Sequence, residues 1–64
     1  MSLEIYCKVR ILSLRFKRLV KCGDTGTLYE IDYDYKYPYL VYIDRIQEYI
    51  RFLEEELEEI TYDG

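Results

Sequence analysis

Six apolar residues in the C-terminal third constrain the fold more than any other feature of this 64-residue chain. Their spacing alternates between three and four residues, which is typical of one stripe of an amphipathic helix. They are Ile43, Ile46, Ile50, Leu53, Leu57 and Ile60. Against a helix, residues 39–43 are rich in β-branched and aromatic side chains, and residues 47–52 fit a strand with Ile50 and Phe52 inward. Periodicity alone leaves two folds open, one mainly β and one with strands and a C-terminal helix.

The first half of the chain predicts strands more directly. Apolar residues occupy every second position of residues 3–11, a period typical of a strand with one solvated face. The phase changes after Ile11, so we expect a bulge or a strand end near residues 12–13. Gly23 and Gly26 lie close together with Asp and Thr between them. They predict a tight turn that requires positive φ, followed by a second strand.

The order of these segments resembles that of small SH3-like β-barrels. Residues 9–12 read VRIL, residues 23–32 GDTGTLYEID, residues 37–44 YPYLVYID and residues 48–60 EYIRFLEEELEEI. Barrels of this shape include the KOW-type modules, the photosystem I subunit PsaE, the nitrile hydratase β-subunit barrel and short uncharacterised phage or bacterial proteins. The resemblance covers about residues 7–60.

The resemblance implies a mainly β fold, a small five-stranded SH3-like barrel with one short helical turn, which residues 1–64 would form as a single domain. The alternative is an α+β fold of antiparallel strands plus one C-terminal amphipathic helix. We expect strands at residues 3–12, 25–32, 39–43, 48–52 and 58–61, with residues 53–57 as the helical turn. The predicted interior consists of Cys7, Val9, Ile11, Leu28, Ile31, Val41, Ile43, Ile50, Phe52, Leu57 and Ile60. Because Leu28 and Ile31 are an odd number of residues apart, the second strand should bend or bulge.

The chain departs from the pattern of these barrels in two ways. Many of them have a short Asp-Gly turn between the third and fourth strands, whereas residues 44–47 here read DRIQ. This difference keeps the helical alternative open. The residues by which nitrile hydratase works with its metal subunit, or by which PsaE docks, have no counterparts here. Neither function therefore carries over.

Few residues of the chain are suited to catalysis or metal binding. Histidine is absent, and Cys7 and Cys22 do not form a C-x-x-C pair, so we expect no metal and no cofactor. No nucleophile motif or Gly-rich phosphate loop is present, and we predict that the protein is not an enzyme. The sequence shows no secretory signal, and its longest uncharged run, residues 37–43, is too short to span a membrane. We therefore expect a cytoplasmic protein.

The tyrosines carry the leading functional hypothesis. Seven of the nine fall within residues 29–49, more than one small core can enclose, and exposed tyrosine is enriched at protein interfaces. We predict a non-catalytic small binding module that acts through protein–protein contact. Tyr35 and Tyr37 are the expected loop contacts, with Tyr42 and Tyr49 as neighbours on adjacent strands. The resemblance adds a role as a phage or mobile-element accessory protein.

Three alternatives remain open, and two of them follow from the distribution of charge. Residues 1–22 carry a net charge of +5 and residues 23–64 a net charge of −9, which together give −4. A KOW-like module would bind nucleic acid through the basic loop of residues 15–21, with contacts from Arg15, Phe16, Lys17, Arg18 and Lys21. The acidic residues 54–59 would instead mimic phosphate and inhibit a host nucleic-acid enzyme. Pairing of edge strands would give a homodimer.

Overall fold

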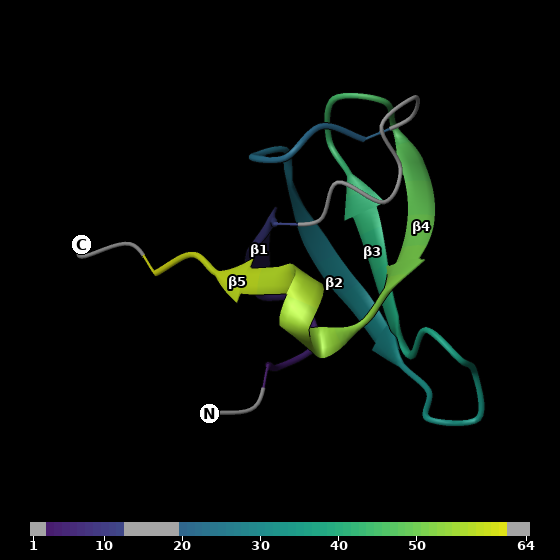
Figure 1. Ribbon diagram of the computed structural model, residues 1–64. Helices are drawn as coiled ribbons and strands as arrows, with labels where there is room; N and C mark the ends of the chain where they lie inside the picture. The colour runs from purple at the N-terminus through teal and green to yellow at the C-terminus, as the bar shows by residue number, and fades with distance from the viewer. Residues whose placement is uncertain (1–2, 13–19, 62–64) are drawn as a thin grey trace.

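The alternating apolar segments form one antiparallel sheet in the computed structural model, which describes residues 3–12 and 20–61 (Figure 1). The strands are β1 (Lys8–Ile11), β2 (Thr25–Ile31), β3 (Tyr39–Ile43), β4 (Glu48–Phe52) and β5 (Leu57–Glu59), with one 3-10 turn, η1 (Glu54–Glu56). The predicted mainly β class with five strands and one short helical turn is confirmed. The described part of the chain contains no α-helix, so the alternative with a C-terminal amphipathic helix is wrong.

The strands lie in the order β4-β3-β2-β1-β5. The first four form a meander of antiparallel neighbours, and β5 returns to pair with β1. The N-terminal half of β2 pairs with β1, while β3 pairs with most of the length of β2. Figure 1 shows β5 running across the direction of β3 and β4, so the sheet is strongly bent and its inner face surrounds the core. This arrangement is compatible with a small β-barrel-like fold.

The predicted bulge in the second strand is confirmed. The register between β2 and β3 shifts between Leu28, which pairs with Val41, and Glu30, which pairs with Leu40. Tyr29 is the extra residue of this bulge. Because the bulge changes the phase of the strand, Leu28 is buried and Ile31 packs against the same core although they are three residues apart. The Tyr29 side chain faces solvent.

The C-terminal apolar residues belong to successive elements and not to one helix. Ile43 ends β3, Ile50 lies in β4 and Leu57 begins β5, while Ile46 and Leu53 occupy connections and Ile60 follows β5. All six are buried or half-buried. The connection between β3 and β4 and the turn η1 each change the phase of the chain. Apolar residues at helical spacing therefore reach a common core from separate strands.

The β3–β4 hairpin closes without the glycine that such turns favour. Gln47 has a φ of 55°, and its backbone N–H donates to the Ile43 carbonyl at 2.8 Å. This left-handed conformation is easiest for glycine or asparagine. Five residue pairs between β3 and β4 flank the turn. These pairs stabilise the hairpin against the strain at Gln47.

Four predicted elements have other bounds in the structure, among them the second strand, which ends at Ile31 and not at residue 32. The first strand, predicted at residues 3–12, begins only at Lys8, because residues 4–7 form a turn in which the Cys7 N–H donates to the Glu4 carbonyl at 3.2 Å. The last strand is Leu57–Glu59 and not residues 58–61. The helical turn covers Glu54–Glu56 and not residues 53–57. The phase change after Ile11 marks the end of β1, as predicted.

Among residues 3–12 and 20–61, nine side chains form the buried core. They are Val9, Ile11, Val20, Leu28, Tyr39, Val41, Ile43, Phe52 and Leu57. Seven of these were predicted, whereas Val20 and Tyr39 were not. Cys7, Ile31 and Ile50 are half-buried and pack against this core. Ile60, also predicted to lie inside, is half-buried.

The two glycines serve different purposes, so the prediction of one turn for both was wrong in part. Gly23 has a φ of +98° and lies in the turn before β2. Gly26 is buried within β2, opposite Val9 and Ile43. There a side chain would collide with β3, so Gly26 allows close approach of two strands.

Asp24 connects the turn before β2 to the β3–β4 hairpin. Its carboxylate accepts hydrogen bonds from Arg45 Nε at 3.1 Å and Arg45 Nη2 at 3.0 Å, and from the Lys21 N–H at 2.8 Å. The hydrogen bonds from Arg45 are the main reason that the pKa of Asp24 lies below its ordinary value. A carboxyl with a lowered pKa stabilises the fold above its unfolded pKa and loses that contribution as the pH falls through its folded pKa.

Asp24→Asn is therefore expected to lower the free energy of unfolding near neutral pH by about 1–3 kcal/mol, the usual contribution of hydrogen bonds to a charged group. The difference from the unsubstituted protein should shrink as the pH falls below about 4, the ordinary pKa of Asp in an unfolded chain, and should disappear once the pH is below the lower pKa of Asp24 in the folded protein. Urea unfolding of both proteins at a series of pH values measures this difference. Asp34→Asn, an exposed position, is the control at neutral pH. A difference that stays constant with pH would contradict the role given to the Asp24 charge.

Candidate functional site

Four tyrosine rings gather on the outer face of the sheet, and we call them the tyrosine cluster: Tyr6, Tyr29, Tyr42 and Tyr49. The ring centroids of Tyr42 and Tyr49 are 5.0 Å apart, and those of Tyr29 and Tyr49 are 5.4 Å apart. Tyr6 meets Tyr29 at 5.6 Å with the ring planes at 89°. All these contacts are edge-to-face, the arrangement that aromatic quadrupoles favour. The rings thus hold one another in place.

Each member reaches this face for a local structural reason. Tyr42 and Tyr49 are directly paired across β3 and β4, and neighbouring residues of a strand alternate between faces, so both point away from the core. Tyr29 points outward because it is the extra residue of the β2 bulge. Tyr6 has a φ of 71° in the turn before β1, and its N–H donates to the Leu28 carbonyl of β2.

The tyrosine cluster is largely open to solvent. Tyr6 is 70%, Tyr49 55% and Tyr29 41% exposed, while Tyr42 is half-buried between its neighbours. Ile5, next to Tyr6 in the sequence, is also exposed. Monomeric proteins usually scatter exposed apolar groups singly, whereas contiguous apolar patches mark interaction sites.

Two of the four tyrosines predicted to bind protein meet in this cluster, and two do not. Tyr42 and Tyr49 are adjacent, as predicted. Tyr35, in the loop between β2 and β3, instead packs its ring 3.7 Å from the guanidinium carbon of Arg51. Tyr37 is half-buried, and the Lys36 ammonium lies 5.7 Å from its ring centroid.

Sequence reasoning missed the other two members of the cluster. Tyr6 was assigned to a continuous first strand, and the turn at residues 4–7 left no clear pattern in the sequence. Tyr29 could have been found, because the expected bulge between Leu28 and Ile31 requires an extra residue that leaves the regular alternation.

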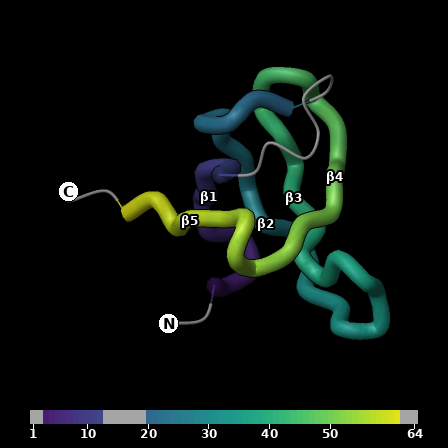
Figure 2. The backbone as a smooth tube through the Cα atoms, in the orientation of Figure 1, coloured from purple at the N-terminus to yellow at the C-terminus, as the bar shows by residue number. Residues whose placement is uncertain are grey.

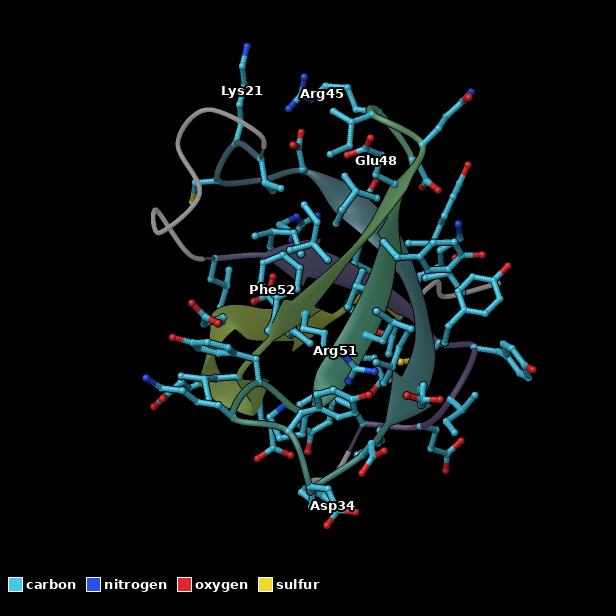
Figure 3. All side chains as sticks on the ribbon, turned by 90° about the vertical axis from the view of Figure 1, so that its right-hand side faces the viewer. Lys21, Asp34, Arg45, Glu48, Arg51 and Phe52 are labelled. Carbon is cyan, nitrogen blue, oxygen red and sulfur yellow. The ribbon has the colours of Figure 1, made fainter. Side chains whose placement is uncertain are left out.

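Arg51 links the tyrosine cluster to the β2–β3 loop. It lies two residues after Tyr49 in β4 and so on the same face. Its Nη2 donates to Glu30 Oε2 at 2.8 Å, and the Tyr35 ring stacks against its guanidinium. Figure 3 shows Arg51 midway along the sheet, between Asp34 at one end and Arg45 and Glu48 at the other.

A second aromatic feature lies where the β2–β3 loop meets η1. It is an open groove of about 390 Å³ lined by Tyr33, Pro38, Tyr39, Leu53, Glu54 and Glu55. The Tyr33 and Tyr39 hydroxyls are 3.2 Å apart, and the Tyr39 hydroxyl donates to Glu54 Oε2 at 3.1 Å. The hydrogen bond with Tyr33, burial and the Glu54 carboxylate all raise the pKa of Tyr39. The Tyr39 hydroxyl therefore keeps its proton at any physiological pH.

Most residues predicted to bind nucleic acid lie outside the described part of the chain. These are Arg15, Phe16, Lys17 and Arg18, whereas Lys21 is described and exposed. Four other basic residues are held in ion pairs, namely Lys8 with Asp44, Arg10 with Glu58, Arg45 with Asp24 and Arg51 with Glu30. These four positive charges are balanced within the protein.

The remaining chemical groups offer little that is reactive. Burial is the largest cause of the raised pKa of the Cys7 thiol, which makes it a weaker nucleophile at neutral pH. The exposed Cys22 thiol donates a weak hydrogen bond to the Leu12 carbonyl at 3.6 Å. Within residues 3–12 and 20–61, no three Cys, Asp or Glu side chains lie together in a way that could hold a metal ion. Over the same residues, no helix has the length and apolar character needed to cross a membrane.

No protein-family model, curated protein or solved structure matches this chain. Its function is therefore inferred from its own residues and their geometry.

Proposed function

We propose that this protein is a non-catalytic binding module that contacts another protein through the tyrosine cluster. The observation that carries the proposal is the packing of four tyrosine rings on one sheet face, three of them exposed. Tyrosine presents a large apolar area with a polar tip, and it is enriched among residues that dominate binding energy.

The mutual contacts of the rings favour binding. A side chain that is already fixed loses less conformational entropy when a partner immobilises it, so more of the contact energy appears as affinity. The cross-strand position of Tyr42 and Tyr49 on a hydrogen-bonded sheet adds further rigidity. A tyrosine that only covered a strand would not need three ring neighbours, as Tyr29 has in Tyr6, Tyr42 and Tyr49.

We further propose that the fold is a small SH3-like barrel. The strand order β4-β3-β2-β1-β5 and the 3-10 turn before β5 support it, because these barrels share a four-strand meander closed by a fifth strand next to the first. A role as a phage or mobile-element accessory protein rests on the sequence resemblance alone.

The alternatives have less support from the described residues. Nucleic-acid binding depends on unbalanced positive charge, and four described bases are already paired with carboxylates. Phosphate mimicry by residues 54–59 requires a continuous acidic row. Within it, Leu57 is buried, Glu58 is paired with Arg10, and Glu56 Oε1 accepts the Leu53 N–H at 2.8 Å.

A binding experiment with paired variants tests the proposal. The protein and its Tyr29→Ser/Tyr49→Ser variant are immobilised and exposed to a lysate of the cells that produce the protein. We expect a protein captured by the unsubstituted chain to be lost from the double variant, since each tyrosine at the centre of an interface contributes about 2 kcal/mol or more. The captured protein is then purified and titrated against both forms.

Tyr35→Ser is the matched control, because Tyr35 is 52% exposed but lies outside the tyrosine cluster and does not line the groove. Capture should survive this substitution. Capture that is lost equally in both variants, or that falls steeply with salt and with Lys17→Ala and Lys21→Ala, would refute the tyrosine cluster as the binding surface. Sedimentation of the purified protein shows whether the captured partner is a second copy of the chain.

A further inference from the structure

The groove between the β2–β3 loop and η1 combines aromatic rings and carboxylates in one place. Tyr39 forms its buried floor, and the exposed ring of Tyr33 stands against it with centroids 6.2 Å apart and planes at 88°. Glu54 and Glu55 contribute the acidic wall. Figure 2 shows the β2–β3 loop projecting beyond the same end of the sheet at which the chain turns from β4 into β5.

The hydrogen bonds in the groove leave the Glu54 carboxylate able to accept more. The single Tyr39 proton is donated to Glu54 Oε2, so the Tyr33 hydroxyl must be the donor in its 3.2 Å contact with Tyr39. A carboxylate offers about four acceptor positions, and this chain of hydroxyls uses one of them. Glu54 and Glu55 are both exposed and both line the groove.

The protein already shows what such a set of groups binds. Against the same loop, Arg51 of β4 stacks on the Tyr35 ring at 3.7 Å and donates to Glu30 at 2.8 Å. An aromatic face together with a carboxylate is the environment that a guanidinium favours, because it stacks and also donates two parallel hydrogen bonds. The groove repeats this combination with Tyr33 and Glu54.

No cation of the described chain occupies the repeated site. Neither Glu54 nor Glu55 forms an ion pair with any lysine or arginine among residues 3–12 and 20–61. The basic residue of the adjacent loop, Lys36, lies over the Tyr37 ring and does not line the groove. Asp32 and Asp34 add negative charge to the same loop. The groove is thus complementary to a positive side chain that the described residues do not supply.

We propose that the groove between the β2–β3 loop and η1 binds an arginine side chain of another protein, stacked on Tyr33 and hydrogen-bonded to Glu54 and Glu55. This site goes beyond the tyrosine cluster and lies apart from it. It adds specificity for a basic residue to a contact that the tyrosines would make by apolar area. The two carboxylates distinguish arginine from a methylated ammonium, which cannot donate as many hydrogen bonds.

The test uses the peptide acetyl-Gly-Arg-Gly-amide and its citrulline counterpart, which has nearly the same shape but no charge. Titration is followed by the backbone amide shifts of the ¹⁵N-labelled protein. We expect saturable shifts confined to Tyr33 and residues 53–55 with the arginine peptide, at a dissociation constant on the order of millimolar for so small a ligand. The citrulline and lysine peptides should bind at least about tenfold more weakly than the arginine peptide.

Glu54→Gln/Glu55→Gln removes the two charges and keeps an oxygen that accepts the Tyr39 hydrogen bond. This variant should weaken binding of the arginine peptide about tenfold or more. Glu48→Gln makes the same chemical change at the opposite end of the sheet (Figure 3) and should leave binding within about twofold. Equal shifts with citrulline, tighter binding of lysine, shifts elsewhere on the protein, or full binding by the double variant would each overturn the proposal. Failure of this test leaves capture by the tyrosine cluster unaffected, so the two proposals fail separately.

Discussion

Gly26→Ala is expected to destabilise the protein by about 3 kcal/mol or more, which is comparable with the whole stability of a domain of this size. Gly26 is buried in β2 opposite Ile43 of β3. An added Cβ would overlap the Tyr42 carbonyl oxygen and lie 2.9 Å from Val41 Cγ1. The Tyr42 carbonyl belongs to the paired backbone of β3 and the Val41 side chain is fully buried, so neither can move aside without disturbing strand pairing or core packing. The collision therefore falls on the strand that carries Tyr42.

Circular dichroism and urea unfolding measure this effect directly. Gly23→Ala is the matched control, since nothing lies within 4 Å of its added Cβ and only its φ of +98° opposes the change. Its expected effect is about 1–2 kcal/mol, the usual strain of a left-handed non-glycine residue. If Gly26→Ala were as stable as Gly23→Ala, the close approach of β2 and β3 would be wrong.

The two glycines also show how far sequence reasoning could go. Glycines close together with Asp and Thr between them suggested a turn, and Gly23 has the positive φ expected there. The sequence alone does not distinguish a glycine that is required for its positive φ from a glycine that is required because a side chain would not fit. The second role of Gly26 becomes visible only when β3 is placed against β2.

The strands could be predicted where the local sequence favoured a strand throughout, and less well where a turn interrupted the strand pattern. The segments of β3 and β4 were located to the residue, because residues 39–43 are rich in β-branched and aromatic side chains and residues 47–52 fit an alternation of inward and outward residues. Residues 3–7 also alternate, yet they form a turn at Tyr6 that is stabilised by a hydrogen bond to β2. Such a long-range contact leaves no trace in local periodicity.

The two proposed binding surfaces were predictable in part for the same reason. The adjacency of Tyr42 and Tyr49 follows from the pairing of two well-predicted strands. The groove was not foreseen, because it joins Tyr33 to Glu54 across 21 residues of sequence. Its acidic wall was considered only as part of a phosphate-like row of glutamates. That row is interrupted, because Glu56 accepts a hydrogen bond from the Leu53 N–H and Leu57 is buried.

Phe52→Ala is the second change expected to have a large effect. Phe52 is the largest fully buried side chain, at the end of β4 opposite Tyr39. Truncation of a buried phenylalanine costs about 3–5 kcal/mol, from lost apolar burial and from the cavity that remains. A domain of this size has only about 3–10 kcal/mol of stability. Urea unfolding should therefore show a variant that is largely unfolded or has a much lower midpoint, while Phe52→Leu should lose only about 1.5 kcal/mol.

Tyr49→Ala, three residues earlier on the same strand, provides the contrast. Its ring is more than half exposed on the outer face, so the variant should lose only the cross-strand aromatic contact, about 1 kcal/mol or less. Equal losses at positions 49 and 52 would mean that the two faces of β4 have been assigned wrongly. A large loss at Phe52 with a small loss at Tyr49 separates the residues that hold the sheet together from those that face a partner. Urea unfolding of the Tyr29→Ser/Tyr49→Ser variant under the same conditions then shows whether its failure to capture protein reflects a lost contact surface or a lost fold.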